Sequence, residues 1–335
     1  MRLFTLFVLA ACCTAAVLAS VSQIENSLLR LRFQDGNLVS FLDKAQGQEK
    51  AGSSDKPIWE IDLVDEKGLL SIDSSSDRDA LESQLEGDML TMIWKSIRVS
   101  KSAPTVRVAL EVHLADNAST SDWKLSAGLE TEQEERGDLD FPISSIGLWS
   151  AKINVAVSTG SSSSTGQLFF PYGLGNLYTN PARYALDNHN NIMATYPSGG
   201  ASMQFMAVAD ADVDDVEAKS GGSGVYVGTH DGKGYIKDIL YSVAKDSKNR
   251  ESKDSSVLTI VAYPENTGLP FDSKNPSWHM PYSVTVGLVQ NVATSKGRPL
   301  HVEAAMIYRK AMVGSSIDTK ETEWLKGTCT CKYVG

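Results

Sequence analysis

Cysteine is scarce in this chain, and its placement limits the possible folds and sites. The 335 residues contain four cysteines: Cys12 and Cys13 near the start, and Cys329 and Cys331 near the end. Disulfide-dependent secreted domains are small and dense in cysteine, so this chain is not a disulfide scaffold. Cys329 and Cys331 form half of a possible zinc site, but no second Cys or His pair has ligand spacing. We therefore expect no metal and no cofactor.

Clusters of basic residues are also missing. The chain has 31 Lys and Arg against 41 Asp and Glu, which gives a formal net charge of −10. Binding to a phosphate backbone needs a concentrated basic surface, so we expect no nucleic-acid partner. The acidic run Asp210–Asp215 offers carboxylate oxygens to calcium, but it lacks the glycine and terminal glutamate of an EF-hand loop. A solvated loop is the simpler interpretation.

Long hydrophobic runs are confined to the N-terminus. Leu3–Leu18 is almost wholly apolar, but at about 16 residues it is short for a membrane span. It follows the basic start Met1-Arg2 and ends at Val17-Leu18-Ala19, a small-residue cleavage site. These features predict a signal peptide over residues 1–19 and a secreted protein without a membrane span. In such a protein Asn117-Ala118-Ser119 predicts N-glycosylation at Asn117.

The rest of the chain is dominated by short segments that alternate apolar and polar residues. In Thr105–Ala115 every second residue from Val106 to Leu114 is apolar, which is typical of a half-buried strand. Asp35-Gly36 stands between two such segments and predicts a tight hairpin. We count about 14 or 15 strands by this criterion. Only Pro299–Val313 has the spacing of a convincing helix.

Strands with one apolar face must bury it against a second sheet. A β domain of this size exceeds an immunoglobulin sandwich. We therefore predict an all-β fold, a large antiparallel β-supersandwich with one C-terminal helix. The predicted organisation is a signal peptide over 1–19, the sandwich over 20–298, the helix over 299–313 and a tail over 314–335.

The segment from residue 168 to residue 237 holds most candidate functional residues. Its first part is rich in tyrosine, glycine and asparagine and reads as irregular, neither strand nor helix, whereas the later parts read as strands. Exposed rings can cover the apolar face of a sugar, while amides and charged groups pair with its hydroxyls. A turn-rich sandwich with core aromatics is the alternative. The predicted carbohydrate-binding residues are Tyr172 and Tyr178 for stacking, Gln204 and Lys237 as donors, Asp231 as an acceptor, His230, and Trp278 as a further stacking candidate.

Several short motifs, taken in order, resemble one family. They are Asn26–Phe33 with Asp35-Gly36-Asn37-Leu38 and Asp43, Phe141-Pro142, Pro171 with Gly175, Tyr196-Pro197, Ser202–Phe205, Gly224-Val225-Tyr226 with His230-Asp231 and Lys237, Pro264-Glu265-Asn266, and Ala304-Ala305 with Tyr308-Arg309. In this order they resemble the N-terminal β-sandwich region of large glycoside-hydrolase-like proteins. In those proteins a galactose-mutarotase-like supersandwich precedes a (β/α)8 barrel. The resemblance covers nearly all of the chain after the signal peptide.

The resemblance also implies where catalysis takes place. In such proteins the helix corresponding to Ala304–Arg309 leads into the barrel, which carries the paired carboxylates that flank a glycosidic bond. This sequence ends about 26 residues after Arg309, too few for a barrel. We therefore expect a secreted, non-catalytic sandwich that binds carbohydrate or serves as a structural accessory. The alternative is a fragment of a secreted glycosidase whose barrel partner is missing from this chain.

An aldose epimerase is a second alternative, and it leaves enzyme activity open. Such enzymes share the supersandwich architecture and use a histidine and a carboxylate as acid and base on a sugar. No motif of that family surrounds any histidine here. The candidates are His113, His189, His230, His279 and His301, with Glu111, Asp231 and Glu265.

Overall fold

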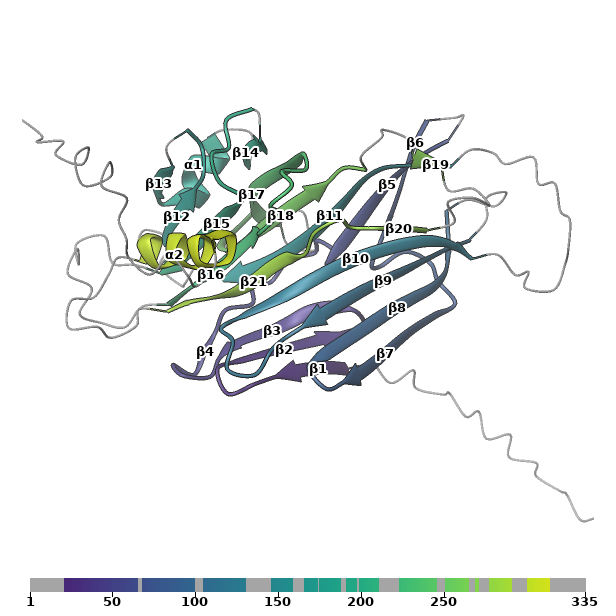
Figure 1. Cartoon of the computed structure of the whole chain (residues 1–335), viewed down its shortest axis with the longest axis horizontal. Helices are drawn as coiled ribbons and strands as arrows, with labels where there is room; N and C mark the ends of the chain where they lie inside the picture. The colour runs from purple at the N-terminus through teal and green to yellow at the C-terminus, as the bar shows by residue number, and fades with distance from the viewer. Residues whose placement is uncertain are drawn as a thin grey trace, which may run out of the picture.

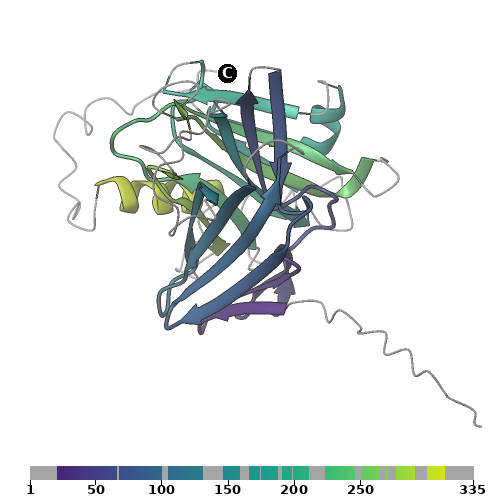
Figure 2. The same ribbon diagram turned by 90° about the vertical axis from the view of Figure 1, so that its right-hand side faces the viewer.

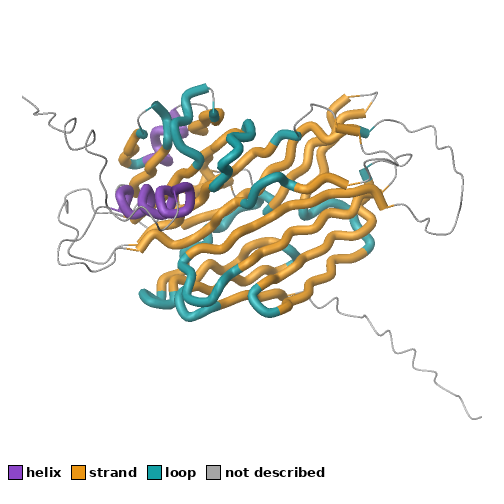
Figure 3. Tube along the Cα trace, viewed as in Figure 1, coloured by secondary structure: helices purple, strands orange, loops and turns teal. Residues whose placement is uncertain are grey.

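The computed structural model describes residues 21–65, 68–99, 105–130, 146–158, 166–173, 175–187, 191–197, 199–210, 223–245, 251–264, 269–270, 277–290 and 300–313. The predicted signal peptide, nearly all of the Asp210–Asp215 run, the C-terminal tail and all four cysteines lie outside these residues. Within the described part the chain forms antiparallel sheets and two helices, and strands dominate the trace (Figure 3).

The strands form three sheets (Figure 1). A four-stranded sheet has the order β1-β2-β3-β4, with β1 (Val21–Glu25), β2 (Leu29–Gln34), β3 (Asn37–Asp43) and β4 (Gln48–Glu49). A ten-stranded sheet has the order β13-β12-β15-β16-β21-β10-β9-β8-β7, and β20 also pairs with β10. Its strands are β7 (Ala80–Glu86), β8 (Met89–Arg98), β9 (Thr105–His113), β10 (Thr120–Glu130), β12 (Gly166–Phe170), β13 (Asn176–Thr179), β15 (Phe205–Asp210), β16 (Ser223–Thr229), β20 (Ser277–His279) and β21 (Val284–Gln290).

A seven-stranded sheet completes the sandwich. Its order is β14-β17-β18-β11-β5-β6, and β19 also pairs with β11. Its strands are β5 (Trp59–Asp65), β6 (Gly68–Asp73), β11 (Gly147–Ser158), β14 (Asn191–Tyr196), β17 (Lys237–Lys245), β18 (Glu251–Ala262) and β19 (Leu269–Pro270). The all-β supersandwich predicted from the alternating pattern is confirmed.

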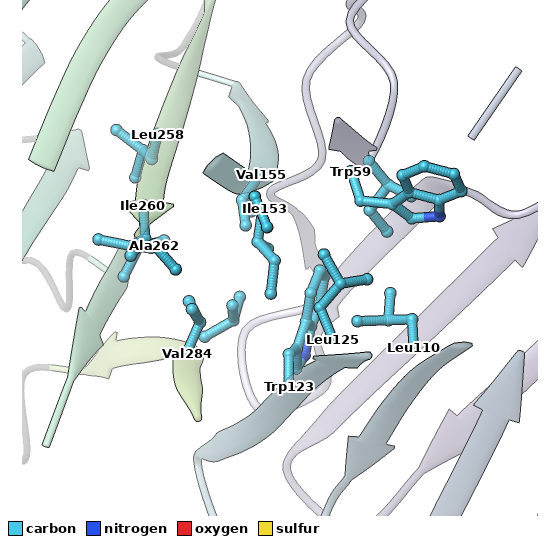
Figure 4. Packing of buried hydrophobic residues seen from close by; sticks show 14 of the residues in the cluster. Trp59, Leu110, Trp123, Leu125, Ile153, Val155, Leu258, Ile260, Ala262 and Val284 are labelled. Carbon is cyan, nitrogen blue, oxygen red and sulfur yellow. The ribbon is translucent and has the colours of Figure 1, made fainter. Parts of the chain in front are cut away.

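The core lies between the inner faces of the sheets. Figure 4 shows Leu110 and Trp123 of the ten-stranded sheet opposite Ile153 and Val155 of the seven-stranded sheet. The four-stranded sheet joins the same core along the half formed by β7–β10, as Figures 1 and 2 show. There the ring of Phe33 meets Trp123 edge-on at 5.9 Å between centroids. One continuous cluster of buried side chains therefore connects all three sheets.

The predicted hairpin at Asp35-Gly36 joins β2 to β3. Both residues have positive φ, +49° and +78°, as a type I′ turn requires. A Cβ on Gly36 would lie 2.5 Å from the indole of Trp94, so a side chain is excluded by packing as well as by conformation. The turn thus packs against Trp94 in the core of the ten-stranded sheet.

The sequence pattern predicted one of the two helices and missed the other. The predicted C-terminal helix is confirmed as α2 (Leu300–Val313). The prediction that the tyrosine-rich segment is irregular was wrong, because β12 is followed there by β13 and α1 (Pro181–Asp187). The carboxamide oxygen of Asn180 accepts a hydrogen bond from the Arg183 amide at 3.3 Å, and Pro181 takes the first helical position. Elements of four to seven residues are too short to display a period.

Helix α2 lies across the outer face of the ten-stranded sheet, over β15, β16 and β21 (Figure 1). Beneath it Phe169, Phe205 and Tyr226 form a row of stacked rings, with centroids 5.3 and 5.2 Å apart. Tyr308 of the helix contacts Phe205 at 5.1 Å, and Ala304 is fully buried. The helix therefore covers a second, smaller apolar cluster outside the main core. In the described part of the chain, neither helix is long and apolar enough to cross a membrane.

Candidate functional site

Three of the predicted binding residues meet at the ends of strands from different sheets. Gln204 precedes β15 and Asp231 follows β16, both in the ten-stranded sheet, whereas Lys237 opens β17 of the seven-stranded sheet. The Lys237 ammonium donates to Asp231 Oδ2 at 2.9 Å, to Gln204 Oε1 at 3.0 Å and to the Tyr235 carbonyl at 2.7 Å. We call Gln204, Asp231 and Lys237 the buried triad.

The buried triad is closed to solvent and satisfied internally. Lys237 and Gln204 are 0% exposed and Asp231 is 6% exposed. The Gln204 amide donates to the Asp231 carbonyl at 2.9 Å, and the Asp231 carboxylate accepts from the amides of Lys233 and Tyr235 at 2.8 and 2.6 Å. The donors and acceptors that we assigned to sugar hydroxyls therefore pair with one another. The triad therefore links two sheets through side chains that are closed to solvent.

Aromatic rings enclose the charge of the buried triad. The Lys237 nitrogen lies 4.4 Å from the centroid of Tyr282 and 5.1 Å from that of Tyr196. Burial lowers the pKa of Lys237, although Asp231 acts in the opposite direction. Burial would raise the pKa of Asp231, but hydrogen bonds from Lys237 and two backbone amides outweigh it and lower that pKa. Burial and nearby carboxylates raise the pKa of Tyr282 far above its ordinary value.

His230 is part of a hydrogen-bonded chain on the outer sheet face. The Thr285 hydroxyl donates to Asp122 Oδ1 at 2.6 Å, so its oxygen accepts from His230 Nδ1 at 3.2 Å. The other ring nitrogen, Nε2, then accepts from the Tyr226 hydroxyl at 2.9 Å. This arrangement requires a neutral imidazole, and burial lowers the pKa of His230 despite the opposing charge of Asp122. Tyr308 lies beside the ring, with centroids 6.0 Å apart.

The two predicted stacking tyrosines lie on one hairpin but differ in exposure. Tyr172, in the turn after β12, is 50% exposed. Its backbone bridges to Ala201, and a Cβ on Gly200 would lie 2.6 Å from its ring, so the ring lies against the chain at Gly200. Tyr178 is half-buried against the core and contacts the exposed ring of Tyr184 at 4.7 Å. Tyr172 is therefore the predicted aromatic with an available face.

Two further predicted residues are placed differently. Trp278 lies on β20, is 6% exposed and belongs to the main core, so its prediction as a stacking platform was wrong. Asn117 is exposed in the turn between β9 and β10, with a φ of +59°. Its side-chain oxygen accepts from the Ser27 hydroxyl at 2.9 Å. Glycosylation of Asn117 stays a prediction.

Acid–base pairs and metal sites were the remaining sequence hypotheses. His113 lies 2.8 Å from Asp88 Oδ2, but both groups are exposed at the end of a β-hairpin and not across a pocket. His189 and Glu265 lie outside the described residues. Among the residues that the structure describes, no three His, Cys, Asp or Glu side chains gather in a way that could hold a metal.

Sequence reasoning missed the aromatic residues that enclose the buried triad and His230. Tyr196, Tyr282 and Tyr308 all contact the buried triad or His230. They come from three separate parts of the chain. Tyr196 and Tyr308 belong to the motifs of the family resemblance, but nothing in the sequence assigned them or Tyr282 to this site. The cis peptide bond between Tyr196 and Pro197 is a feature that the dipeptide alone could have suggested.

Comparison with known proteins gives two kinds of similarity. No family model matches the chain. A protein of Monosiga brevicollis named "Putative glycoside hydrolase 22789" is 26% identical over 269 residues, covering 80% of this chain and 18% of its own length. The chain thus spans about a fifth of that relative.

The structural similarity is to part of an enzyme. Alpha-N-acetylgalactosaminidase NagBb of Bifidobacterium bifidum, in complex with GalNAc, matches with a TM-score of 0.53 and 11% identity over 86% of this chain and 38% of that chain. A quadruple mutant of the same enzyme matches with a TM-score of 0.52 and 10% identity, with the same coverage. The resemblance predicted from the sequence is confirmed at the level of the fold: the chain has the β-sandwich architecture of a glycoside-hydrolase-like protein.

Proposed function

We propose that this chain is the non-catalytic, carbohydrate-recognising sandwich of a secreted glycoside-hydrolase-like protein. The observation that carries the proposal is the half-exposed ring of Tyr172, fixed against Gly200 on a sandwich of the glycosidase type. A fixed ring face can cover the C–H face of a sugar with little loss of side-chain entropy.

The surroundings of Tyr172 support the same function. The Gly173 amide donates to the Gly200 carbonyl at 2.7 Å, and the Ser202 amide donates to the Pro171 carbonyl at 2.8 Å. These bonds tie the tyrosine turn to the segment that leads into Gln204 and the buried triad. The triad thus has a supporting role: it holds the strand ends on which the exposed turn rests.

The test is a direct binding measurement. Purified protein is titrated with galactose, N-acetylgalactosamine and a glycan array, and the best probe is used for variants. We expect Tyr172→Ala to weaken binding about tenfold, the order expected for one lost aromatic contact. Tyr172→Phe should keep it. Leu85→Ala, at an exposed apolar position on β7, is the control. Equal affinity of the native protein and Tyr172→Ala would rule out this surface.

Secretion has its own experiment. Expression with the native N-terminus in a eukaryotic secretory host should release a protein whose first residue follows Ala19 or Ser20, as N-terminal sequencing reports. Asn117→Gln should then lower the mass of the exported protein by the same amount that enzymatic deglycosylation removes from the native protein. Retention of residues 1–19 in the exported protein would contradict the signal-peptide assignment.

A second candidate function is support of a catalytic partner domain. Only Ala304 of α2 is fully buried, whereas Met306 and Val313 are exposed apolar residues on the side away from the sheet. Arg309 and Lys310 are exposed as well, so this part of the helix offers both apolar and charged contacts to a second domain. Sequencing of the native transcript beyond codon 335 is the test. A frame that continues into a (β/α)8 barrel favours this function, and an immediate stop codon argues against it.

A further inference from the structure

The outer face of the seven-stranded sheet carries an exposed tryptophan that the sequence pattern did not single out. Trp59, Trp94, Trp123 and Trp278 are buried, but Trp149 on β11 is 45% exposed. The cause is a β-bulge: the register between β11 and β5 shifts between Leu148 and Ser150. Bulges of this kind re-aim a side chain and are common beside functional sites.

The bulge sets the direction of two consecutive side chains. Leu148 and Ala151 are both fully buried in the core, although they are three residues apart. In an unbroken strand they would point to opposite faces. Trp149 and Ser150 therefore both point outward, with Trp149 as the extra residue that has no partner on β5. The tryptophan thus stands beside the polar groups that Ser150 contacts.

Those polar groups form a fixed network across three strands. Asp62 of β5 accepts hydrogen bonds from Ser150 at 2.8 Å and from Ser71 of β6 at 2.6 Å. The Lys152 ammonium lies 3.0 Å from Asp62 Oδ2 and 3.4 Å from Glu60 Oε2. Burial would raise the pKa of Asp62, but these hydrogen bonds outweigh it and hold that pKa below its ordinary value. Both charges of the pair are therefore present at neutral pH.

The polar row continues onto the next strands. Ala262 pairs with Ala151, so Tyr263 follows β18 next to Ser150 on the outward side. The Tyr263 hydroxyl donates to Asp238 of β17 at 2.6 Å, and Thr195 of β14 donates to the same carboxylate at 2.6 Å. A half-buried second ring, three carboxylates, an ammonium and several hydroxyls thus accompany the indole along one face.

We propose that this outer face around Trp149 is a second carbohydrate-binding surface, separate from Tyr172, that takes a sugar ring on the indole and its hydroxyls on the partly exposed side chains of Lys152 and Glu60. A sugar ring has an apolar C–H face and hydroxyls around its edge. The face matches an exposed indole, and the hydroxyls match the fixed charged groups beside it. An apolar partner protein would match the tryptophan but would remove from water the exposed quarter of the Lys152 and Glu60 side chains, 25% and 24%. The polar row therefore favours a sugar.

The experiment uses the exposed indole as its own reporter. Galactose, N-acetylgalactosamine and the glycans bound on an array are titrated while acrylamide quenching of tryptophan fluorescence is followed. The difference between the native protein and Trp149→Phe isolates the contribution of Trp149. We expect bound glycan to protect this component from quenching, and Trp149→Ala to weaken binding about tenfold.

Controls separate this surface from the first one. Leu69→Ala removes an exposed apolar side chain from β6 of the same sheet and should leave affinity unchanged. Trp149→Phe, which keeps a ring, should retain most of the affinity, and thermal unfolding verifies that each variant is folded. Tyr172→Ala, measured in parallel, reports on the other surface and should leave quenching protection of Trp149 intact. Unchanged affinity in Trp149→Ala, no protection from quenching, or no glycan binding at all overturns the proposal.

Discussion

At the scale of single residues, the distinction between a ligand contact and a structural contact is decided by burial. Lys237, Asp231 and Gln204 have the chemistry of a sugar site, but each finds its partners within the protein. A buried charged pair is tolerated when geometry and extra hydrogen bonds offset desolvation. Here three oxygens and two rings surround one ammonium.

Removal of one partner should therefore be costly. We expect Lys237→Met to lower the free energy of unfolding by about 3–5 kcal/mol, because the Asp231 carboxylate would stay buried without its cation. Lys233→Met, at an exposed neighbouring lysine, is the matched control and should change stability by less than about 0.5 kcal/mol. Urea denaturation measures both. The double variant Lys237→Met with Asp231→Asn should recover part of the loss, and a single variant as stable as the control would contradict a structural role.

The histidine chain predicts an acid-sensitive stability. Burial lowers the pKa of folded His230 below the ordinary value of about 6.5 that the unfolded chain keeps. As the pH falls through that ordinary value, the unfolded chain binds a proton that the folded protein does not. The free energy of unfolding then falls by up to about 1.4 kcal/mol per pH unit, until the folded imidazole also protonates.

His230→Gln should flatten this pH dependence. The groups facing the imidazole are Tyr226, Thr285 and Tyr308, with Asp122 behind Thr285. Urea denaturation between pH ~5 and ~8 compares the slopes of native protein and variant. His279→Gln, at an exposed position on β20, is the control for loss of a histidine. Identical slopes in the native protein and His230→Gln would show that another group titrates.

At the scale of elements, departures from regular geometry position the side chains that contact solvent. The bulge in β11 turns Trp149 outward, and the chain at Gly200 supports Tyr172. Helix α2 acts in the opposite way, because it closes the aromatic row on the outer face of the ten-stranded sheet. Ala304 is small enough to let the helix backbone approach that row.

A charge at the contact between α2 and the sheet should detach the helix. We expect Ala304→Asp to destabilise docking by about 2–4 kcal/mol, because the carboxylate would be buried without a partner. Phe169, Phe205 and Tyr226 would then bind a dye specific for exposed apolar surface, such as ANS. Ala311→Asp places the same charge on the exposed side of the helix and is the control. Equal dye fluorescence from the two variants would mean that α2 does not cover the row.

At the scale of the whole molecule, three sheets share one core without any cysteine in the described residues. Because the four-stranded sheet packs on the β7–β10 half through rings such as Phe33 and Trp123, it should not unfold separately. Cooperative unfolding follows from a contiguous core.

A cavity in that shared core should lower the stability of the entire sandwich. We expect Phe33→Ala to cost about 3–5 kcal/mol and to shift a single transition seen alike by circular dichroism and tryptophan fluorescence. Val39→Ala, at an exposed position on β3 of the same sheet, should have little effect. Two separate transitions in the native protein would show that the four-stranded sheet is an independent unit.

Local pattern predicted the strands whose two faces differ, such as β9 and the β2–β3 hairpin, because alternation and turn chemistry are properties of neighbouring residues. The same reasoning failed for β13 and α1, which are shorter than the window in which a period can be recognised. It also failed for Trp278, since an aromatic on a short strand has no local sign of whether it faces core or solvent.

The sequence by itself therefore determined an all-β sandwich with a C-terminal helix, because a strand that buries one face alternates apolar and polar residues. It also marked Gln204, Asp231 and Lys237 as donors and acceptors, but it assigned their partners to sugar hydroxyls. Only the tertiary structure decided that these three pair with one another and that Tyr172 and Trp149 face solvent. Exposure depends on which distant segments pack over a residue, and on a one-residue bulge that changes the face without changing the local pattern.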